Sequence, residues 1–145
     1  MSTNHSCDKN YLLDLSRVRV KTGRMTDREK AARPEDLTRL FVERANAKDA
    51  EGIALLYERD AVMAYPPGRQ TVGREAIRKL WEEALPHLPE FRPEEPLPTL
   101  VSGELALTAT APRDGAGARA QVARRQSDGT WLRVLDQPEF IDPNA

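Results

Sequence analysis

Apolar residues recur at helical spacing in three stretches of the first 85 residues. They occupy residues 34–47, 49–58 and 74–85, where positions three and four apart share one face of a helix. In the first stretch this stripe consists of Leu37, Leu40, Phe41 and Ala45. Asp49 stands before the second stretch and is a suitable N-cap residue. The pattern therefore predicts three amphipathic helices, each burying one side.

The other apolar runs are short and are bounded by proline, glycine and aspartate, which is typical of strands. The first covers residues 61–65 and ends at a Pro-Pro-Gly turn. After a proline-rich connection, three more cover residues 99–110, with a bulge or turn at 102–103, and then 118–126 and 130–137. Asp-Gly pairs between the last three predict hairpins. Three helices followed by a meander of strands predict an α+β fold, with helices on one face of a curved sheet and a cavity on its concave side.

Composition narrows the classes of protein to consider. At 145 residues the chain fits one domain with its own core. Its 22 basic and 23 acidic side chains nearly cancel, so neither nucleic acid nor a membrane surface is an expected partner. Cys7 is the one cysteine, which favours the reducing cytoplasm. The two histidines lie far apart and no glycine-rich phosphate loop occurs, so we expect no metal and no cofactor.

The two ends of the chain differ from its middle. In residues 1–32, polar residues surround a few apolar ones without a clear period. We expect this segment to be a poorly ordered N-terminal extension. The predicted domain then covers residues 33–141, and residues 142–145 form a tail.

Three segments carry a family resemblance. They are FVERANAKDAEGIALLYERDAVMAYPPG, VGREAIRKLWEEAL and the closing DGTWLRVLDQPEF. Together they resemble the nuclear-transport-factor-two-like superfamily and, within it, the SnoaL-like and ketosteroid-isomerase-like proteins, over about residues 34–140. The resemblance implies a cone-shaped curved antiparallel sheet wrapped around the N-terminal helices, a cystatin-like α+β barrel. It also implies a pocket for an apolar small molecule and a homodimer formed through the outer face of the sheet.

The residues that would catalyse steroid isomerisation are replaced. Ketosteroid isomerases use a helix tyrosine, a strand aspartate as base and a sheet aspartate as acid, and the resemblance places Phe41, Tyr65 and Gln121 at these positions. Phenylalanine has no hydroxyl, tyrosine is a poor base near neutral pH, and glutamine does not titrate. That mechanism is therefore disfavoured. In the same frame Trp81 faces the pocket.

The last strand supplies a carboxylate. By the period of two, Leu132, Val134 and Asp136 share one strand face, and we expect that face to line the pocket. Asp136 is then a candidate general acid or base, because an apolar cavity disfavours its charged form. Tyr65 is the second candidate for a catalytic role, as a hydroxyl donor to a carbonyl oxygen. The candidate ligand-binding residues are Phe41, Trp81, Gln121, Leu132 and Val134.

Two functions fit these candidates. The first is a cofactor-free isomerase, cyclase or dehydratase acting on an apolar substrate. The second is a non-catalytic ligand-binding or dimeric association module. Ordinary structural roles also fit single residues: Asp136 as an ion-pair partner, Gln121 as a hydrogen-bonded sheet residue, Phe41 and Trp81 as core. An open cavity with Asp136 pointing into it would favour the first function.

Overall fold

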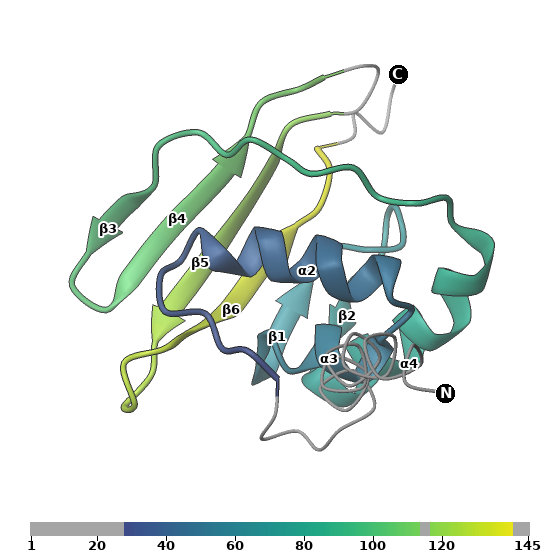
Figure 1. Ribbon diagram of the computed structural model, residues 1–145, viewed down its shortest axis with the longest axis horizontal. Coiled ribbons are helices and arrows are strands. Elements are labelled where there is room, and N and C mark those ends of the chain that lie inside the picture. Colours follow the sequence, from purple (N-terminus) through teal and green to yellow (C-terminus); the bar gives the residue numbers. More distant parts are fainter. Residues whose placement is uncertain (1–27, 114–116, 141–145) are drawn as a thin grey trace, which may run out of the picture.

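Three helices form where the apolar stripes predict them. The computed structural model describes residues 28–113 and 117–140 (Figure 1). Its helices are α2 (Asp36–Asn46), α3 (Ala50–Ala54) and α4 (Arg74–Ala84), which continues into a 3-10 turn, η2 (Leu85–His87). Asp49 caps α3 as predicted, accepting a hydrogen bond from the Gly52 amide at 3.0 Å. Cys7 and the predicted tail at residues 142–145 lie outside the described residues.

Six strands form one sheet in the order β2-β1-β6-β5-β4-β3. They are β1 (Tyr57–Met63), β2 (Thr71–Val72), β3 (Leu100–Ser102), β4 (Leu105–Thr110), β5 (Arg119–Arg125) and β6 (Trp131–Gln137). Neighbours pair antiparallel, except that β1 and β6 pair parallel. The predicted α+β architecture and the antiparallel order of the last strands are confirmed.

The hairpin turns follow glycine where they are described. Gly129 has φ +86° between β5 and β6, and Gly103 has φ +59° in the turn that divides the predicted strand 99–110 into β3 and β4. Glycine adopts this conformation without a steric cost. The predicted turn at residues 113–115 lies partly outside the described residues. The first strand, predicted at 61–65, already begins at Tyr57, so the second helix is shorter than expected.

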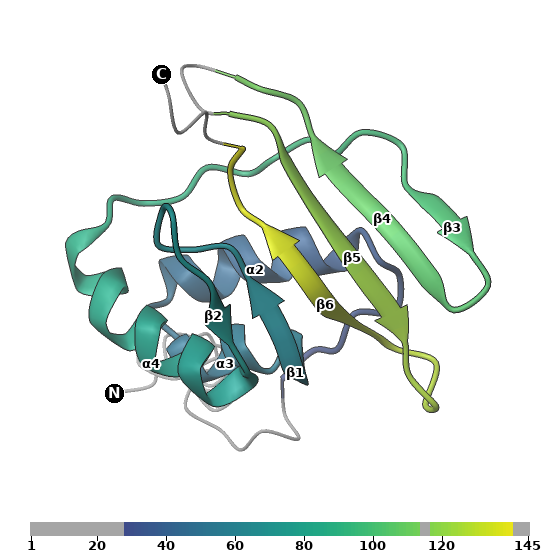
Figure 2. The ribbon, with the colours of Figure 1, turned by 180° about the vertical axis from the view of Figure 1, so that it is seen from behind.

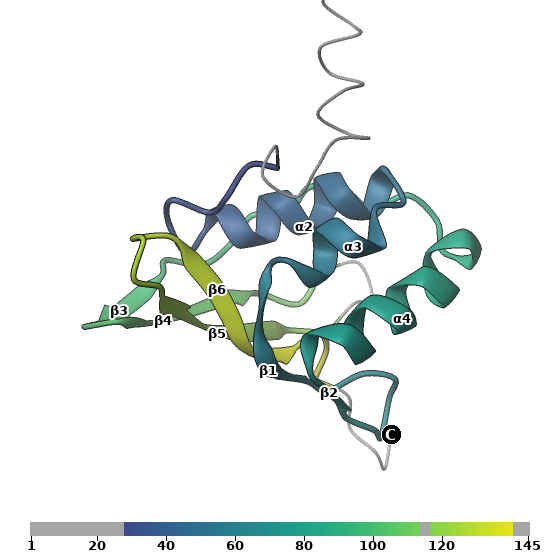
Figure 3. The ribbon, with the colours of Figure 1, turned by 90° about the horizontal axis from the view of Figure 1, so that it is seen from below.

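The helices cover one face of the sheet. In Figure 3, α2 and α3 lie on the same side of the strands, with α4 beside the β1–β2 end. Leu37 and Leu40 of α2, Ile77 of α4, and Tyr57 and Met63 of β1 are buried together in the core. This packing leaves the inner face of β5 and β6 to form the wall of a cavity.

A bulge in β6 changes which residues face inward. Ala123 of β5 pairs with Arg133, but the neighbouring Val122 pairs with Leu135, so Val134 is an extra residue on β6. Arg133 and Asp136 are consequently both buried on the inner side, while Leu135 is half exposed. The prediction that Leu132, Val134 and Asp136 share one face is wrong, since it assumed uninterrupted alternation.

The outer face of the sheet carries a continuous aliphatic row. Neighbouring strands pair these residues one after another, from β3 through β4, β5, β6 and β1 to β2: Leu100, Leu107, Val122, Leu135, Val62 and Val72. Leu100, Leu135 and Val72 are each at least half exposed. Figure 2 views the sheet from this side, with α2 behind it. We call these six residues the aliphatic row.

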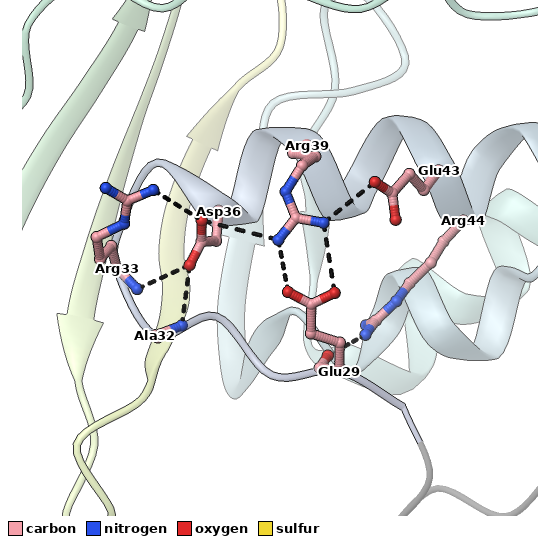
Figure 4. Close-up of polar contacts among 7 residues, drawn as sticks. All are labelled: Glu29, Ala32, Arg33, Asp36, Arg39, Glu43 and Arg44. Carbon is pink, nitrogen blue, oxygen red and sulfur yellow. Dashed lines mark hydrogen bonds and ion pairs between the residues drawn. The ribbon is translucent and has the colours of Figure 1, made fainter. Parts of the chain in front are cut away.

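The described chain packs against the domain from Arg28 onward. The Arg28 guanidinium pairs with Asp49, at 2.9 Å between Nη2 and Oδ1. Ala31 is buried and its carbonyl accepts a hydrogen bond from the Trp131 amide at 2.9 Å. Figure 4 shows how Glu29 is attached to α2. Its carboxylate accepts hydrogen bonds from Arg39, and its backbone carbonyl accepts one from Arg44. Residues 28–32, which we predicted as part of an extension, thus belong to the packed domain.

Gly52 has no room for a side chain. A Cβ atom there would lie 2.0 Å from Asp49 Oδ2 and 2.9 Å from Arg28 Nε, so Gly52→Ala would push away the carboxylate that caps α3 and holds Arg28. We expect the variant to lose about 1–2 kcal/mol of unfolding free energy, the usual value of an N-cap, in urea titration. In a protein that already carries Asp49→Ala, Gly52→Ala should cost little more, because the carboxylate that it would displace is absent. Wild-type stability of Gly52→Ala alone would contradict this account.

None of the helices within residues 28–113 and 117–140 has the length and apolar character that crossing a bilayer requires.

Candidate functional site

A cavity of about 200 Å³ opens between α2, α4 and the inner side of β5 and β6. Its walls come from both helices, two strands and three connecting segments. The lining residues are Thr38, Phe41, Ala64, Tyr65, Pro67, Trp81, Leu88, Phe91, Glu94, Arg119, Gln121, Arg133, Asp136, Pro138 and Glu139. Small-molecule sites usually occupy about 300–1,000 Å³, so this cavity suits a compact ligand of one or two rings.

Aromatic rings form one wall. Phe41 of α2 meets Trp81 edge to face at 5.3 Å and Phe91 in the same way at 5.6 Å. Tyr65, which follows β1, lies parallel to Trp81 at 6.0 Å between ring centroids. Such offset and edge contacts are the favoured arrangements of aromatic pairs. The wall is therefore both apolar and well ordered.

The floor of the cavity is polar and centres on Asp136. Its Oδ2 accepts a hydrogen bond from the Tyr57 hydroxyl at 2.5 Å, and its Oδ1 accepts one from Gln121 Nε2 at 3.2 Å. Thr108 in turn donates its hydroxyl to Gln121 Oε1 at 3.0 Å. Because a carboxylate only accepts hydrogen bonds whereas a threonine hydroxyl can donate or accept, the Gln121 NH₂ group points toward Asp136 and its oxygen toward Thr108. Asp136 is 5 % exposed and is held in one orientation.

Arg133 supplies a buried positive charge beside Asp136. Its Nη1 lies 3.6 Å from Asp136 Oδ2 and 3.4 Å from the Tyr57 hydroxyl, and its Nη2 donates to Thr38 Oγ1 at 3.4 Å. The guanidinium also lies 5.6 Å from the centroid of the Phe41 ring, within cation–π range. A buried charge needs such partners, because desolvation alone would be costly.

Electrostatics fix the protonation of two members of this group. Burial and the nearby Asp136 carboxylate raise the pKa of Tyr57 far above its usual value, so the hydroxyl keeps its proton and acts as a donor. Burial by itself lowers the pKa of Arg133, but the oxygens of Tyr57 and Asp136 outweigh burial and raise it overall. The guanidinium therefore remains charged.

The rim of the cavity carries further charges. Arg119 of β5 forms an ion pair with Glu94, and Glu139 accepts a hydrogen bond from the Gly117 amide at 3.0 Å. Within the described residues, no group of three histidine, cysteine, aspartate or glutamate side chains is placed to hold a metal ion.

Five of the seven predicted site residues meet in this cavity: Phe41, Tyr65, Trp81, Gln121 and Asp136. Leu132 and Val134 do not line it, and Leu132 instead borders a separate hollow near Arg28. That hollow is larger, about 540 Å³, but its buried cation Arg44 already donates to the carbonyls of Gly52 and Glu29. The binding and catalytic roles of all seven residues stay predictions.

Sequence analysis missed Tyr57 and Arg133. Tyr57 was assigned to the end of a helix, and strict alternation placed Arg133 on the face opposite to Asp136. One signal for Arg133 is visible in the sequence: it is the sole cation in WLRVLDQ, an otherwise largely apolar strand. A charge in such a strand points to a buried partner.

Comparison with solved structures identifies the fold. A nuclear-transport-factor-two-like protein with a cystatin-like fold from Novosphingobium aromaticivorans is 19% identical, with a TM-score of 0.57 over 99% of this chain and 92% of that one. A ketosteroid isomerase-like protein from Erwinia carotovora atroseptica is 16% identical, with a TM-score of 0.56 over 71% and 89%. A chain from Thiobacillus denitrificans, provisionally assigned as a calcium/calmodulin-dependent protein kinase type II association domain, is 20% identical, with a TM-score of 0.61 over 76% and 96%.

At these identities the likeness shows the fold alone, and the predicted cystatin-like α+β architecture is confirmed. No curated protein matches the chain. The model of the SnoaL-like domain, however, matches residues 38–134, which is more than half of the sequence. The chain belongs to the SnoaL-like domain family.

Proposed function

We propose that the cavity binds a compact, largely apolar molecule and that Asp136 removes a proton from it. This is chemistry of the cofactor-free isomerase, cyclase or dehydratase kind. One observation carries the proposal: a carboxylate with 5 % exposure lies at the floor of a cavity walled by Phe41, Tyr65 and Trp81. Burying a carboxylate costs free energy. A base that an apolar cavity shields from water is, however, more reactive.

The neighbours of Asp136 suit a base. Arg133 and the Tyr57 hydroxyl both contact Oδ2, so Oδ1 is the oxygen better placed to take a proton. Its one described partner, Gln121 Nε2, is at 3.2 Å, a longer contact that a substrate can replace or share. Tyr65 lines the same cavity and its hydroxyl would donate to a substrate oxygen as charge develops there.

The alternative is binding without chemistry. The observation that favours it is the ion pair itself: Arg133 and Asp136 are both buried and 3.6 Å apart, so each also satisfies the other. In that case Asp136 would serve to hold Arg133, and the cavity would bind ligands without turning them over.

A generic proton-abstraction probe separates the two. In 5-nitrobenzisoxazole, removal of the ring C–H proton breaks the N–O bond and releases a coloured nitrophenolate, so turnover needs only a base and an apolar cavity. We expect saturable turnover by the wild type and a loss of about a hundredfold or more in Asp136→Asn. Asp128→Asn, at an exposed turn, is the matched control and should retain full turnover. Equal rates for Asp136→Asn and wild type would favour binding without chemistry.

We also infer that a second copy of this chain covers the aliphatic row. The row crosses all six strands and contains no charged residue. A charged partner would therefore find no complementary charge on it. An exposed apolar band of this kind usually marks an interface, and a second copy presents the same surface to complete it.

A further inference from the structure

The hollow of about 540 Å³ near Arg28 shares no lining residue with the site cavity. Its walls are the segment before α2, the end of α2, the residues after α3, the first residue of α4, and the turn between β5 and β6 with the start of β6. Four of the lining residues are cations and two are carboxylates: Arg28, Lys30, Arg44 and Arg74 against Glu29 and Asp128. The lining therefore carries an excess of positive charge.

Two of the four cations are neutralised by carboxylates. Arg28 pairs with Asp49, at 2.9 Å between Nη2 and Oδ1. Lys30 pairs with Asp128, at 3.2 Å between Nζ and Oδ2. The other two, at the end of α2 and the start of α4, form no ion pair with a carboxylate of the described chain. The excess charge of the hollow thus resides on these two arginines.

Arg44 is a buried charge with neutral partners. It is 8 % exposed, and it donates to the Gly52 carbonyl at 2.7 Å and to the backbone carbonyl of Glu29 (Figure 4). Carbonyls satisfy its hydrogen bonds but bring no counter-charge, and the Glu29 carboxylate is engaged by Arg39. Burial lowers the pKa of Arg44, an effect that the Asp49 carboxylate offsets only in part. An anion in the hollow would therefore stabilise the charged guanidinium.

Arg74 has hydrogen-bond donors to spare. Its Nε and Nη2 both donate to the Tyr57 carbonyl, at 2.9 and 2.7 Å, which fixes the plane of the guanidinium. Its Nη1 has no partner within the described chain, and it is not one of the buried atoms there that lack a hydrogen bond, so it is open to solvent. Arg74 is also the first residue of α4, where the helix dipole disfavours a cation. Nη1 is thus an oriented donor that a charged acceptor would suit best.

Apolar side chains complete the lining of the hollow: Leu55, Leu56, Trp131 and Leu132. We propose that the hollow binds a small organic anion, with a carboxylate or phosphate on an apolar body. Arg74 Nη1 donates to the anionic group, and Arg44 is its buried counter-charge. This site goes beyond the proposed function and is independent of it, because no residue lines both the hollow and the site cavity.

Three probes with the same ring test the site: benzoate, phenyl phosphate and benzyl alcohol. Trp131 lines the hollow and Trp81 lines the site cavity, so their indole N–H signals in an NMR titration report binding at the two places separately. We expect both anions to shift the Trp131 signal saturably. Their dissociation constants should be at least about tenfold lower than that of benzyl alcohol, the usual value of one hydrogen bond to a charged group.

Arg74→Gln tests the donor. Glutamine removes the charge and Nη1 but keeps an NH₂ group that can bond the Tyr57 carbonyl. We expect it to weaken binding of both anions about tenfold or more and to leave benzyl alcohol unchanged. Arg78→Gln, one turn further along α4 and outside the lining, is the matched control and should bind the anions as the wild type does. A measurement without any variant is salt: 0.5 M NaCl should weaken binding of the anions to the wild type.

Several results would overturn the site. They are equal affinities for the anions and benzyl alcohol, unchanged anion affinity in Arg74→Gln, anion-induced shifts confined to Trp81, and failure of both anions to bind. Tighter binding of either benzoate or phenyl phosphate at Trp131 supports the site and identifies the anionic group that it prefers. None of these results bears on proton removal by Asp136, which turnover of 5-nitrobenzisoxazole measures separately.

Discussion

Arg133→Met is expected to lower the free energy of unfolding by about 3–5 kcal/mol, the usual effect of removing one partner of a buried ion pair. Arg133 is 3 % exposed, and its guanidinium contacts Asp136, Tyr57 and Thr38 at once. Methionine fills a similar volume but leaves the Asp136 carboxylate buried without a counter-charge. The measurement is urea denaturation followed by circular dichroism.

Two variants sharpen this prediction. Arg124→Met removes a partly exposed pair with Glu58 of β1, on the far side of β6, and should cost about 0–1 kcal/mol. The double variant Arg133→Met/Asp136→Leu replaces the whole buried pair with apolar side chains and should recover much of the loss. If Arg133→Met were no more destabilising than Arg124→Met, the buried pair would not support the fold in the way described.

Leu135→Glu is expected to convert the homodimer that we propose into a monomer. Leu135 lies in the aliphatic row on β6 and is 50% exposed in one chain, and a two-fold interface over this row would bury one new charge from each copy. Like charges brought together across an interface cost several kcal/mol, so the dissociation constant should rise at least about a thousandfold. Sedimentation equilibrium over a range of protein concentrations measures it.

Val101→Glu is the matched control for that experiment. Val101 is also an exposed apolar strand residue, 60% exposed, but it neighbours Leu100 on β3 and so points to the opposite face of the sheet. It should leave the dimer intact. A wild-type protein that is monomeric throughout the concentration range, or a Leu135→Glu variant that associates as tightly as the wild type, would remove the aliphatic row as the interface.

Local features of the fold could be predicted where a residue type has one characteristic structural role. Asp49 before an apolar helical stripe predicted a cap, and Asp128-Gly129 between two strands predicted a hairpin; both are confirmed. The helical stripes also identified Phe41 and Trp81 as inward-facing. In each case the physical cause lies within four residues of the position concerned, so the sequence pattern contains it.

The polar floor of the site could not be predicted in the same way. Its members come from β1, β4, β5, β6 and α2, and their meeting depends on the parallel pairing of β1 with β6, which no local pattern encodes. The bulge at Val134 then moved Arg133 and Asp136 to the same side. A bulge leaves no reliable mark in a seven-residue strand, and the period of two fails there without warning.

The most direct measurement of the central claim is a crystal structure of the protein with 5-nitrobenzotriazole, a planar analogue of the turnover probe whose ring N–H can be donated to a base. We expect the bicyclic ring to lie against Phe41 and Trp81, with a ring nitrogen about 2.6–3.2 Å from Asp136 Oδ1, the range of a productive contact with a base. A ring bound elsewhere, with Asp136 contacted by Tyr57, Gln121 and Arg133 alone, would contradict the account.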